Sequence, residues 1–178
     1  MSIKKLRLHG SVSSRGEASD HITLPGDAVV IERGRPRWLL LACPCGCGEK
    51  LPINLDPRAG PAWRIYRRQR SGVSLFPSVW RESGCKSHFV IWRNKIFLFG
   101  IGDANMDDPL QDAEMDALRR AVYERLSERN IVSYTSIAES LDAVPWDVLN
   151  ICRQLVRSGL AREGKDKQRG SFGRASTT

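Results

Sequence analysis

The sequence predicts an α+β protein made of two units, a small β-rich unit followed by a helical one. Short runs rich in Val, Ile, Trp and Phe recur between residues 28 and 99, and Gly, Pro or Asn breaks them about every eight to twelve residues, which is strand spacing. After residue 112 the apolar residues recur at the period of a helix. Residues 1–100 carry 17 Lys and Arg against 7 Asp and Glu, whereas residues 101–150 carry 4 against 11. The charge therefore changes sign where the period changes.

These changes predict the domain boundaries. We expect a β-rich unit over residues 1–102, an acidic linker over 103–111, a helical unit over 112–166 and a flexible basic tail over 167–178. No apolar run reaches the ~18 residues of a membrane span, and the start lacks the apolar segment of a secretion signal. We therefore expect a cytoplasmic protein that has no membrane partner.

The clearest element of the first unit is a hairpin. Its strands, HFVIW (88–92) and KIFLF (95–99), are separated only by Arg93 and Asn94, and Asn tolerates the positive φ of a two-residue turn. Further strands are predicted for residues 28–32, 37–42, 50–55 and 62–66. Residues 1–20 are polar and expected to be partly loose, although KKLRLHG is able to add an edge strand.

The second unit is predicted to contain three helices. The first covers residues 112–129, the second covers 133–141, and the third begins at Pro145 and is closed by Gly159. A short strand and a basic, Gly-containing segment follow.

This order of elements resembles winged helix-turn-helix domains over about residues 112–166. The resemblance implies a third helix that can enter the major groove of DNA. The basic residues that would then contact nucleic acid are Arg153, Arg157, Lys165 and Lys167. A protein-interaction or dimerisation module is the alternative interpretation.

Two clusters predict a metal site. CPCGCG places Cys43, Cys45 and Cys47 within five residues, and CKSH places Cys85 close to His88. Structural zinc needs four N or S ligands, usually as two close pairs from separate loops. Cys43 with Cys47 and Cys85 with His88 have the usual spacings, and Cys45 is the fifth candidate for four positions. We expect one structural Zn²⁺ per chain.

Other candidates near this chemistry have simpler interpretations. Glu49 and Glu82 are close to the ligand loops, but four or five available ligands favour a closed structural site over a catalytic zinc. Cys152 falls on the apolar face of a helix and is predicted to be buried as a small hydrophobe. His9 and His21 are expected to be solvated or satisfied locally.

Residues 28–100 resemble a bacterial family of zinc domains of unknown function. The similarity rests on CPCGCG, on Leu75, Pro77 and Ser78, and on CKSHFVIW. Members are encoded beside ubiquitin-like modifiers and E1-like and E2-like enzymes. The resemblance implies an accessory protein or a peptidase of this pathway, with the ubiquitin-like modifier or its conjugation enzymes as partners.

If the chain is a peptidase, Ser78 is the first candidate for its nucleophile. A catalytic serine needs a base within hydrogen-bond reach. With His88 assigned to the metal, the expected base is His21 or His9. The alternative is that Ser78 only turns the chain after Pro77.

A second function class, a nucleic-acid-binding regulator, follows from the basic segment RIYRRQR. Basic residues that alternate with aromatics can hold single strands by stacking and phosphate contacts. The candidates here are Arg64, Arg67, Arg68 and Arg70. Trp63 lies just before Arg64, and Tyr66 lies between Arg64 and Arg67. A solvated edge strand that resists aggregation is an equally ordinary interpretation.

Overall fold

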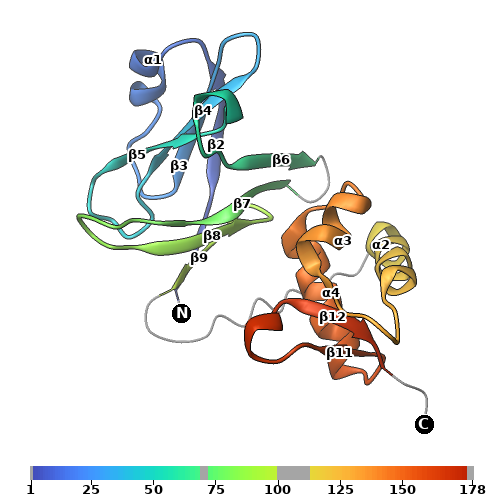
Figure 1. Cartoon of the computed structure of the whole chain (residues 1–178). Coiled ribbons are helices and arrows are strands. Elements are labelled where there is room, and N and C mark those ends of the chain that lie inside the picture. Colours follow the sequence, from blue (N-terminus) through green and yellow to red (C-terminus); the bar gives the residue numbers. More distant parts are fainter. Residues whose placement is uncertain (1, 69–71, 100–112, 176–178) are drawn as a thin grey trace. The chain divides into compact units, whose positions relative to one another are not determined.

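The computed structural model describes residues 2–68, 72–99 and 113–175 (Figure 1). The fold is mixed α+β with a β-rich first part, as the sequence predicts. The chain divides into two compact units, Met1–Ala104 and Asn105–Thr178. The acidic linker predicted for residues 103–111 lies outside the described residues. None of the described helices is long and apolar enough to cross a membrane.

The first unit contains two β-sheets. One has the strand order β2-β3-β4-β5, formed by Arg7–Val12, Asp27–Glu32, Pro36–Ala42 and Lys50–Asn54. The other has the order β1-β9-β8-β7-β6, formed by Ser2–Lys5, Lys95–Phe99, His88–Trp92, Gly72–Trp80 and Arg64–Arg68. β2 and β3 are parallel, and the other strand pairs are antiparallel. A single 3₁₀ turn, Pro57–Ala59, follows β5.

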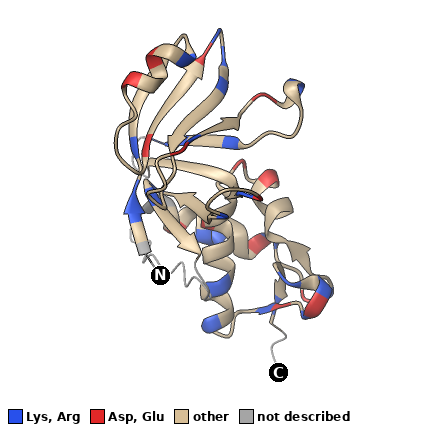
Figure 2. Cartoon of the chain, turned by 90° about the vertical axis from the view of Figure 1, so that its left-hand side faces the viewer, with Lys and Arg blue, Asp and Glu red and all other residues tan. Residues whose placement is uncertain are grey.

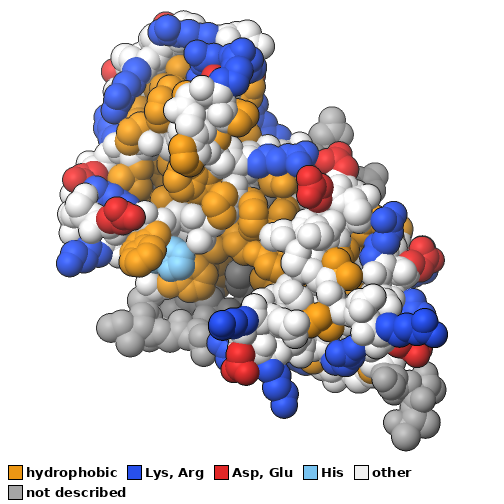
Figure 3. Space-filling model, in the orientation of Figure 1, with side chains coloured by type: hydrophobic (Ala, Val, Ile, Leu, Met, Phe, Trp, Pro, Cys, Tyr) orange, Lys and Arg blue, Asp and Glu red, His pale blue; other side chains and the backbone are white. Residues whose placement is uncertain are grey.

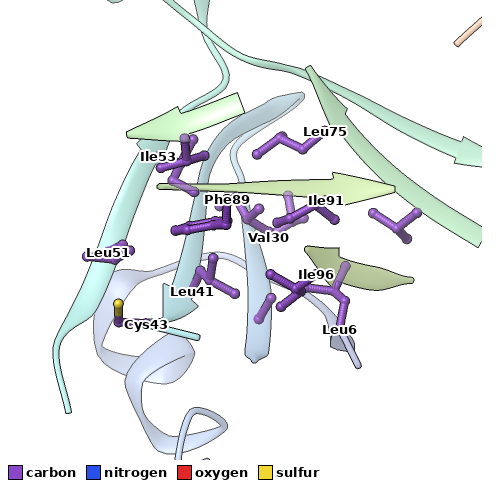
Figure 4. Packing of buried hydrophobic residues seen from close by; sticks show 14 of the residues in the cluster. Leu6, Val30, Leu41, Cys43, Leu51, Ile53, Leu75, Phe89, Ile91 and Ile96 are labelled. Carbon is purple, nitrogen blue, oxygen red and sulfur yellow. The ribbon is translucent and has the colours of Figure 1, made fainter. Parts of the chain in front are cut away.

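The core of this unit lies between the two sheets. Because strand side chains alternate between faces, every second residue points inward. Val30 and Leu41 of one sheet meet Leu75, Phe89 and Ile91 of the other, as Figure 4 shows. Phe89 and Leu41 are fully buried, and burial of such a side chain stabilises a fold by roughly 1.5–3 kcal/mol.

Helix α1 (Arg15–Asp20) covers part of the outer face of the four-stranded sheet. Ala18 packs there against Val29 and Leu40, so β3 is buried on both faces. Residues 1–20 are therefore more ordered than their polarity predicts. The missed signal is the capping-box sequence Ser-x-x-Glu: Ser14 Oγ accepts a hydrogen bond from Glu17 N–H, and the Glu17 carboxylate accepts from Ser13 N–H, one residue before the cap.

The predicted hairpin is confirmed. β8 and β9 pair from His88 with Phe99 to Trp92 with Lys95. Arg93 and Asn94 form the turn, with φ values of 52° and 59°. Both residues lie in the left-handed region that a type I′ turn requires.

The second unit contains the three predicted helices. They are α2 (Ala113–Arg125), α3 (Tyr134–Ser140) and α4 (Pro145–Arg157). The strands β10 (Val132–Ser133), β11 (Ala161–Glu163) and β12 (Ser171–Arg174) form a sheet in the order β10-β12-β11, and a 3₁₀ turn covers Asp166–Gln168. Cys152 is fully buried in α4, as its apolar face predicts.

The structure corrects the flexible tail predicted from residue 167. Phe172 in β12 is fully buried, and β12 pairs with both β10 and β11. The Arg174 guanidinium lies 4.5 Å from the centre of the Tyr123 ring and donates to the Tyr123 carbonyl. Burial of Phe172 and pairing of its strand thus order this segment although its composition is basic.

Candidate active site and metal centre

Four cysteine side chains converge from two loops of the first unit. Cys43, Cys45 and Cys47 lie between β4 and β5, and Cys85 lies between β7 and β8. All four Sγ atoms lie within 4.8 Å of one another, with 3.3 Å between Cys43 and Cys45 and 3.6 Å between Cys43 and Cys85. Thiolates that surround a zinc ion at 2.3 Å lie about 3.8 Å apart. The cluster could therefore hold a metal ion, and its donor set suits zinc.

The backbone of the first loop explains how three nearby thiols can turn to one point. Gly46 and Gly48 have φ values of 93° and 82°, which side chains with a Cβ rarely adopt. Gly46 N–H donates to the Cys43 carbonyl, and Cys43 N–H donates to the Glu49 carbonyl, which closes the loop. The glycines of CPCGCG are thus required by the turn itself.

Polar side chains of the second loop stabilise the thiolate form of Cys85. Ser87 Oγ lies 3.2 Å from Cys85 Sγ, and the Arg81 guanidinium donates to the same sulfur at 3.3 Å. The Ser87 hydroxyl and then Arg81 lower the pKa of Cys85 to about 5. Burial, by contrast, raises the pKa of Cys43. Because a bound metal ion displaces thiol protons, metal binding should overcome that effect of burial.

Arg81 also joins the two loops, since its guanidinium forms an ion pair with the Glu49 carboxylate. Glu49 is thus engaged by an arginine next to the cluster. The group includes Cys45 and leaves out His88, the remaining one of the five candidate ligands.

His88 faces Ser78 instead. His88 Nε2 lies 3.0 Å from Ser78 Oγ, and both residues are half-buried. The register explains the contact: Trp80 pairs with His88 and Val79 with Phe89, so Ser78, two residues before Trp80, lies on the same face as His88. Three residues of β7 face one of β8 just before Val79, and this bulge shifts the register around Ser78.

The structure places His88 beside Ser78, where the sequence predicts His9 or His21. His9 Nε2 lies 3.0 Å from Asp27 Oδ1, and the His9 ring stacks against His21 with 6.4 Å between ring centres. Although burial opposes the change, hydrogen bonds from His9 and from backbone N–H groups lower the pKa of Asp27. His9 is thus engaged by Asp27 and His21 is exposed beside it, whereas His88 lies within hydrogen-bond reach of Ser78. The Cys-x-x-His spacing predicts a metal ligand, but β8 begins at His88 and the ring of His88 faces Ser78.

Aromatic residues surround the pair. The Phe99 ring lies 4.8 Å from the His88 ring and the Trp80 ring 6.2 Å from it, between centres. Trp63 Nε1 donates to the Ser78 carbonyl at 3.2 Å, which holds the backbone of the serine. Within residues 2–68, 72–99 and 113–175, no carboxylate bonds the His88 ring. A hydroxyl and an imidazole at this distance have the geometry that a nucleophile and its general base require.

The basic candidates belong to both units. Arg64, Arg67 and Arg68 are exposed on β6, and Arg64 lies over the Tyr66 ring, 4.9 Å from its centre. Arg70 lies outside the described residues. In the second unit Arg153 and Arg157 are exposed on α4, and Lys165 and Lys167 are exposed between β11 and β12. Figure 2 shows Lys and Arg positions on many other strands and loops, so these basic positions are not unique.

Comparison with known proteins identifies the first unit. Residues 8–99, more than half of the chain, match the family described as bacterial ubiquitination-like system serine protease (BubE). The chain belongs to this family. No curated protein and no solved structure matches the chain.

The BubE match agrees with the bacterial ubiquitination-like context that the sequence predicts, and it replaces a family of unknown function by one described as serine proteases. It spans both cysteine loops and both members of the Ser78–His88 pair. It ends at residue 99, so it carries no information about the second unit.

Proposed function

We propose that this protein is a serine peptidase of a bacterial ubiquitin-like pathway, with Ser78 as its nucleophile and His88 as its general base. The observation that carries the proposal is the 3.0 Å contact between Ser78 Oγ and His88 Nε2 in a member of a serine protease family. The substrate is a ubiquitin-like protein or one of its conjugates.

The chemistry follows from the two groups. His88 Nε2 accepts the hydroxyl proton as Ser78 Oγ attacks a peptide carbonyl, and the imidazolium returns that proton to the leaving amine. Water then attacks the acyl-enzyme, with His88 again as the base. Trp63 contributes by holding the Ser78 carbonyl, so the hydroxyl keeps its direction during both steps.

We further propose that Cys43, Cys45, Cys47 and Cys85 hold one structural zinc ion. When bound, the ion supplies a cross-link between two loops. The second loop, Arg81–Ser87, joins the strand of Ser78 to that of His88. Ser87 Oγ contacts Cys85 Sγ, and the Ser87 carbonyl accepts from Arg81 N–H, so the loop is held from within. The metal site therefore supports the catalytic pair without touching substrate.

Covalent labelling tests the catalytic assignment. A fluorophosphonate should label the zinc-loaded chain at one site, identified by peptide mapping as Ser78. Ser78→Ala should abolish labelling, and His88→Ala should slow it at least about a hundredfold because the base is lost. Ser83→Ala is the matched control, an exposed serine of the β7–β8 loop, and should label normally. Labelling that persists in Ser78→Ala would reject the proposal.

A second candidate function concerns the second unit, which we propose is a winged-helix domain that binds nucleic acid or protein. The order α2-β10-α3-α4-β11-β12 and the exposed lysines between β11 and β12 support it. Joint replacement of Arg153, Arg157, Lys165 and Lys167 should abolish DNA binding, whereas replacement of Arg64, Arg67, Arg68 and Arg70 should weaken it partly. If the intact chain shows no salt-dependent binding to DNA, the nucleic-acid alternative is rejected and a protein partner remains.

A further inference from the structure

The strand that carries Ser78 is paired along only half of one side. β6 pairs with the first half of β7, from Arg68 with Gly72 to Arg64 with Phe76. Before Arg64 the chain turns to the other sheet, where Trp63 N–H donates to the Asn54 carbonyl. In the described part of the chain, no strand pairs with residues 77–80 on the side away from β8. Figure 1 shows the β7–β8 hairpin extending past the beginning of β6.

Backbone groups of Trp80 point to this open side. Arg81 N–H donates to the Ser87 carbonyl at 3.0 Å, so the polar groups of Arg81 point toward the β8 side. Consecutive strand residues direct their backbone groups to opposite sides, so those of Trp80 point away from β8. The Ser78 carbonyl, two residues earlier, has the same direction and accepts from the Trp63 indole.

The side chain of Trp80 is equally available. It is 69% exposed, more than any other large hydrophobic side chain of the described residues. It shares a face with Ser78 and His88, and its ring centre lies 6.2 Å from that of His88. Figure 3 shows hydrophobic side chains exposed over the β7–β8 hairpin. A flat apolar surface and an unpaired strand edge thus meet beside the proposed nucleophile.

We propose that this edge binds the substrate as an extended peptide, which pairs with the backbone of Trp80, runs antiparallel to β7 toward Ser78 and places an apolar side chain against Trp80. The inference rests on the proposed function and deepens it. Strand addition is a common mode of peptide recognition, in which main-chain hydrogen bonds hold the peptide and side-chain pockets select it.

The register makes the proposal specific. Ser78 and Trp80 lie two residues apart on one face, and an antiparallel peptide runs from Trp80 toward Ser78. The residue that contacts Trp80 therefore lies two positions before the residue opposite Ser78. The substrate class is an extended tail with an apolar residue at that position.

Peptidyl phosphonates test the side-chain contact, because they react covalently with a catalytic serine after binding as substrates do. The probes are acetyl-Leu-Ala-Gly and acetyl-Asp-Ala-Gly diphenyl phosphonates, used with the full zinc-loaded chain. The Leu probe should react about tenfold faster than the Asp probe because Leu buries apolar area on Trp80. Trp80→Ala should bring this ratio close to one. Trp38→Ala, which removes an exposed tryptophan of the other sheet, should leave the ratio unchanged.

Backbone methylation tests the strand pairing. An N-methyl group on the Leu residue of the probe removes the donor that faces Trp80 and should slow labelling about fivefold. An N-methyl group on the neighbouring Ala removes a donor that points away, and should have a smaller effect.

The results separate this inference from the proposed function. If a fluorophosphonate without any peptide fails to label Ser78, the peptidase assignment fails. If it labels Ser78 but the Leu and Asp probes react equally, the Trp80 contact is rejected. A Trp80→Ala variant that slows both probes by the same factor would also reject it, because that pattern indicates a structural role.

Discussion

The cysteine cluster and the Ser78–His88 pair lie at the same hairpin but are built in different ways. The cluster is made by loops whose glycines turn sulfur atoms to one point. The pair is made by two strands whose pleat and bulge bring distant residues to one face. Cys85 and His88 are three residues apart, yet one points into the cluster and the other faces Ser78. Proximity in sequence therefore does not assign a histidine to a metal, because the start of a strand changes the direction of its side chain.

The two regions also differ in what their loss should do. The cluster holds loops together, so its loss should affect folding and activity. The pair contributes a hydroxyl and a ring on a sheet that is already packed, so its loss should affect activity alone. The predictions below test this difference.

The largest effect is expected from Cys43→Ser. Structural zinc contributes roughly 10–16 kcal/mol to the folding of small zinc domains, which exceeds or matches the whole stability of a typical domain. The variant should lose zinc and the cooperative unfolding of its first unit. Elemental analysis and circular dichroism measure both, and the native chain should contain about one zinc.

Cys152→Ala is the control for Cys43→Ser, since Cys152 is also buried but lies outside the cluster. It should keep its zinc and lose only about 1–2 kcal/mol. Less than a tenth of an equivalent of zinc in the native chain would contradict the metal site.

The next effect concerns the pair. Ser78→Ala and His88→Asn should each lower kcat/KM at least about 10³-fold, because a nucleophile and its base act as a unit and we propose these roles for the two residues. Zinc content and the midpoint of thermal unfolding should stay near the native values in both variants. Loss of zinc in His88→Asn would show that His88 is a ligand and would break the distinction between the two regions.

A smaller effect is expected from Arg81→Ala, which removes the contacts of the guanidinium with Cys85 and Glu49. Such outer contacts typically change metal affinity about 10-fold to 100-fold. Competition with a chelator should show this loss, while cleavage at saturating zinc should change less. Arg81→Lys keeps the positive charge but loses the two-pronged guanidinium. Its metal affinity should lie between those of Arg81→Ala and the native chain.

The smallest effect is expected from Trp63→Phe. The change removes one hydrogen bond to the Ser78 carbonyl and keeps most of the apolar volume. The loss of about 1 kcal/mol should lower kcat/KM about fivefold with unchanged zinc content. Trp38→Phe serves as the control and should match the native protein, whereas an equal loss in both variants would reject the proposed positioning role of Trp63.

Much of the fold was predictable because its signals are local. The hairpin over 88–99 and the three helices follow from hydrophobic period and turn chemistry that neighbouring residues determine. Helix α1 was missed because it is short, and only its capping box marks it. The tail was misjudged because Phe172 becomes informative only when β10 and β11 flank its strand.

The candidate site likewise has one part that local sequence predicts and one part that depends on tertiary structure. The four cysteines were among five candidates named from sequence, because the spacing of ligands within a loop is a local property, but the sequence did not choose between Cys45 and His88. Ser78 was named as well, but its partner depended on the register of β7 against β8, which a bulge of a few residues changes. By itself, the sequence determined which residue types gather in each loop and strand. Only the tertiary structure decided which of them meet, because a strand pair brings together side chains whose separation in sequence carries no signal of contact.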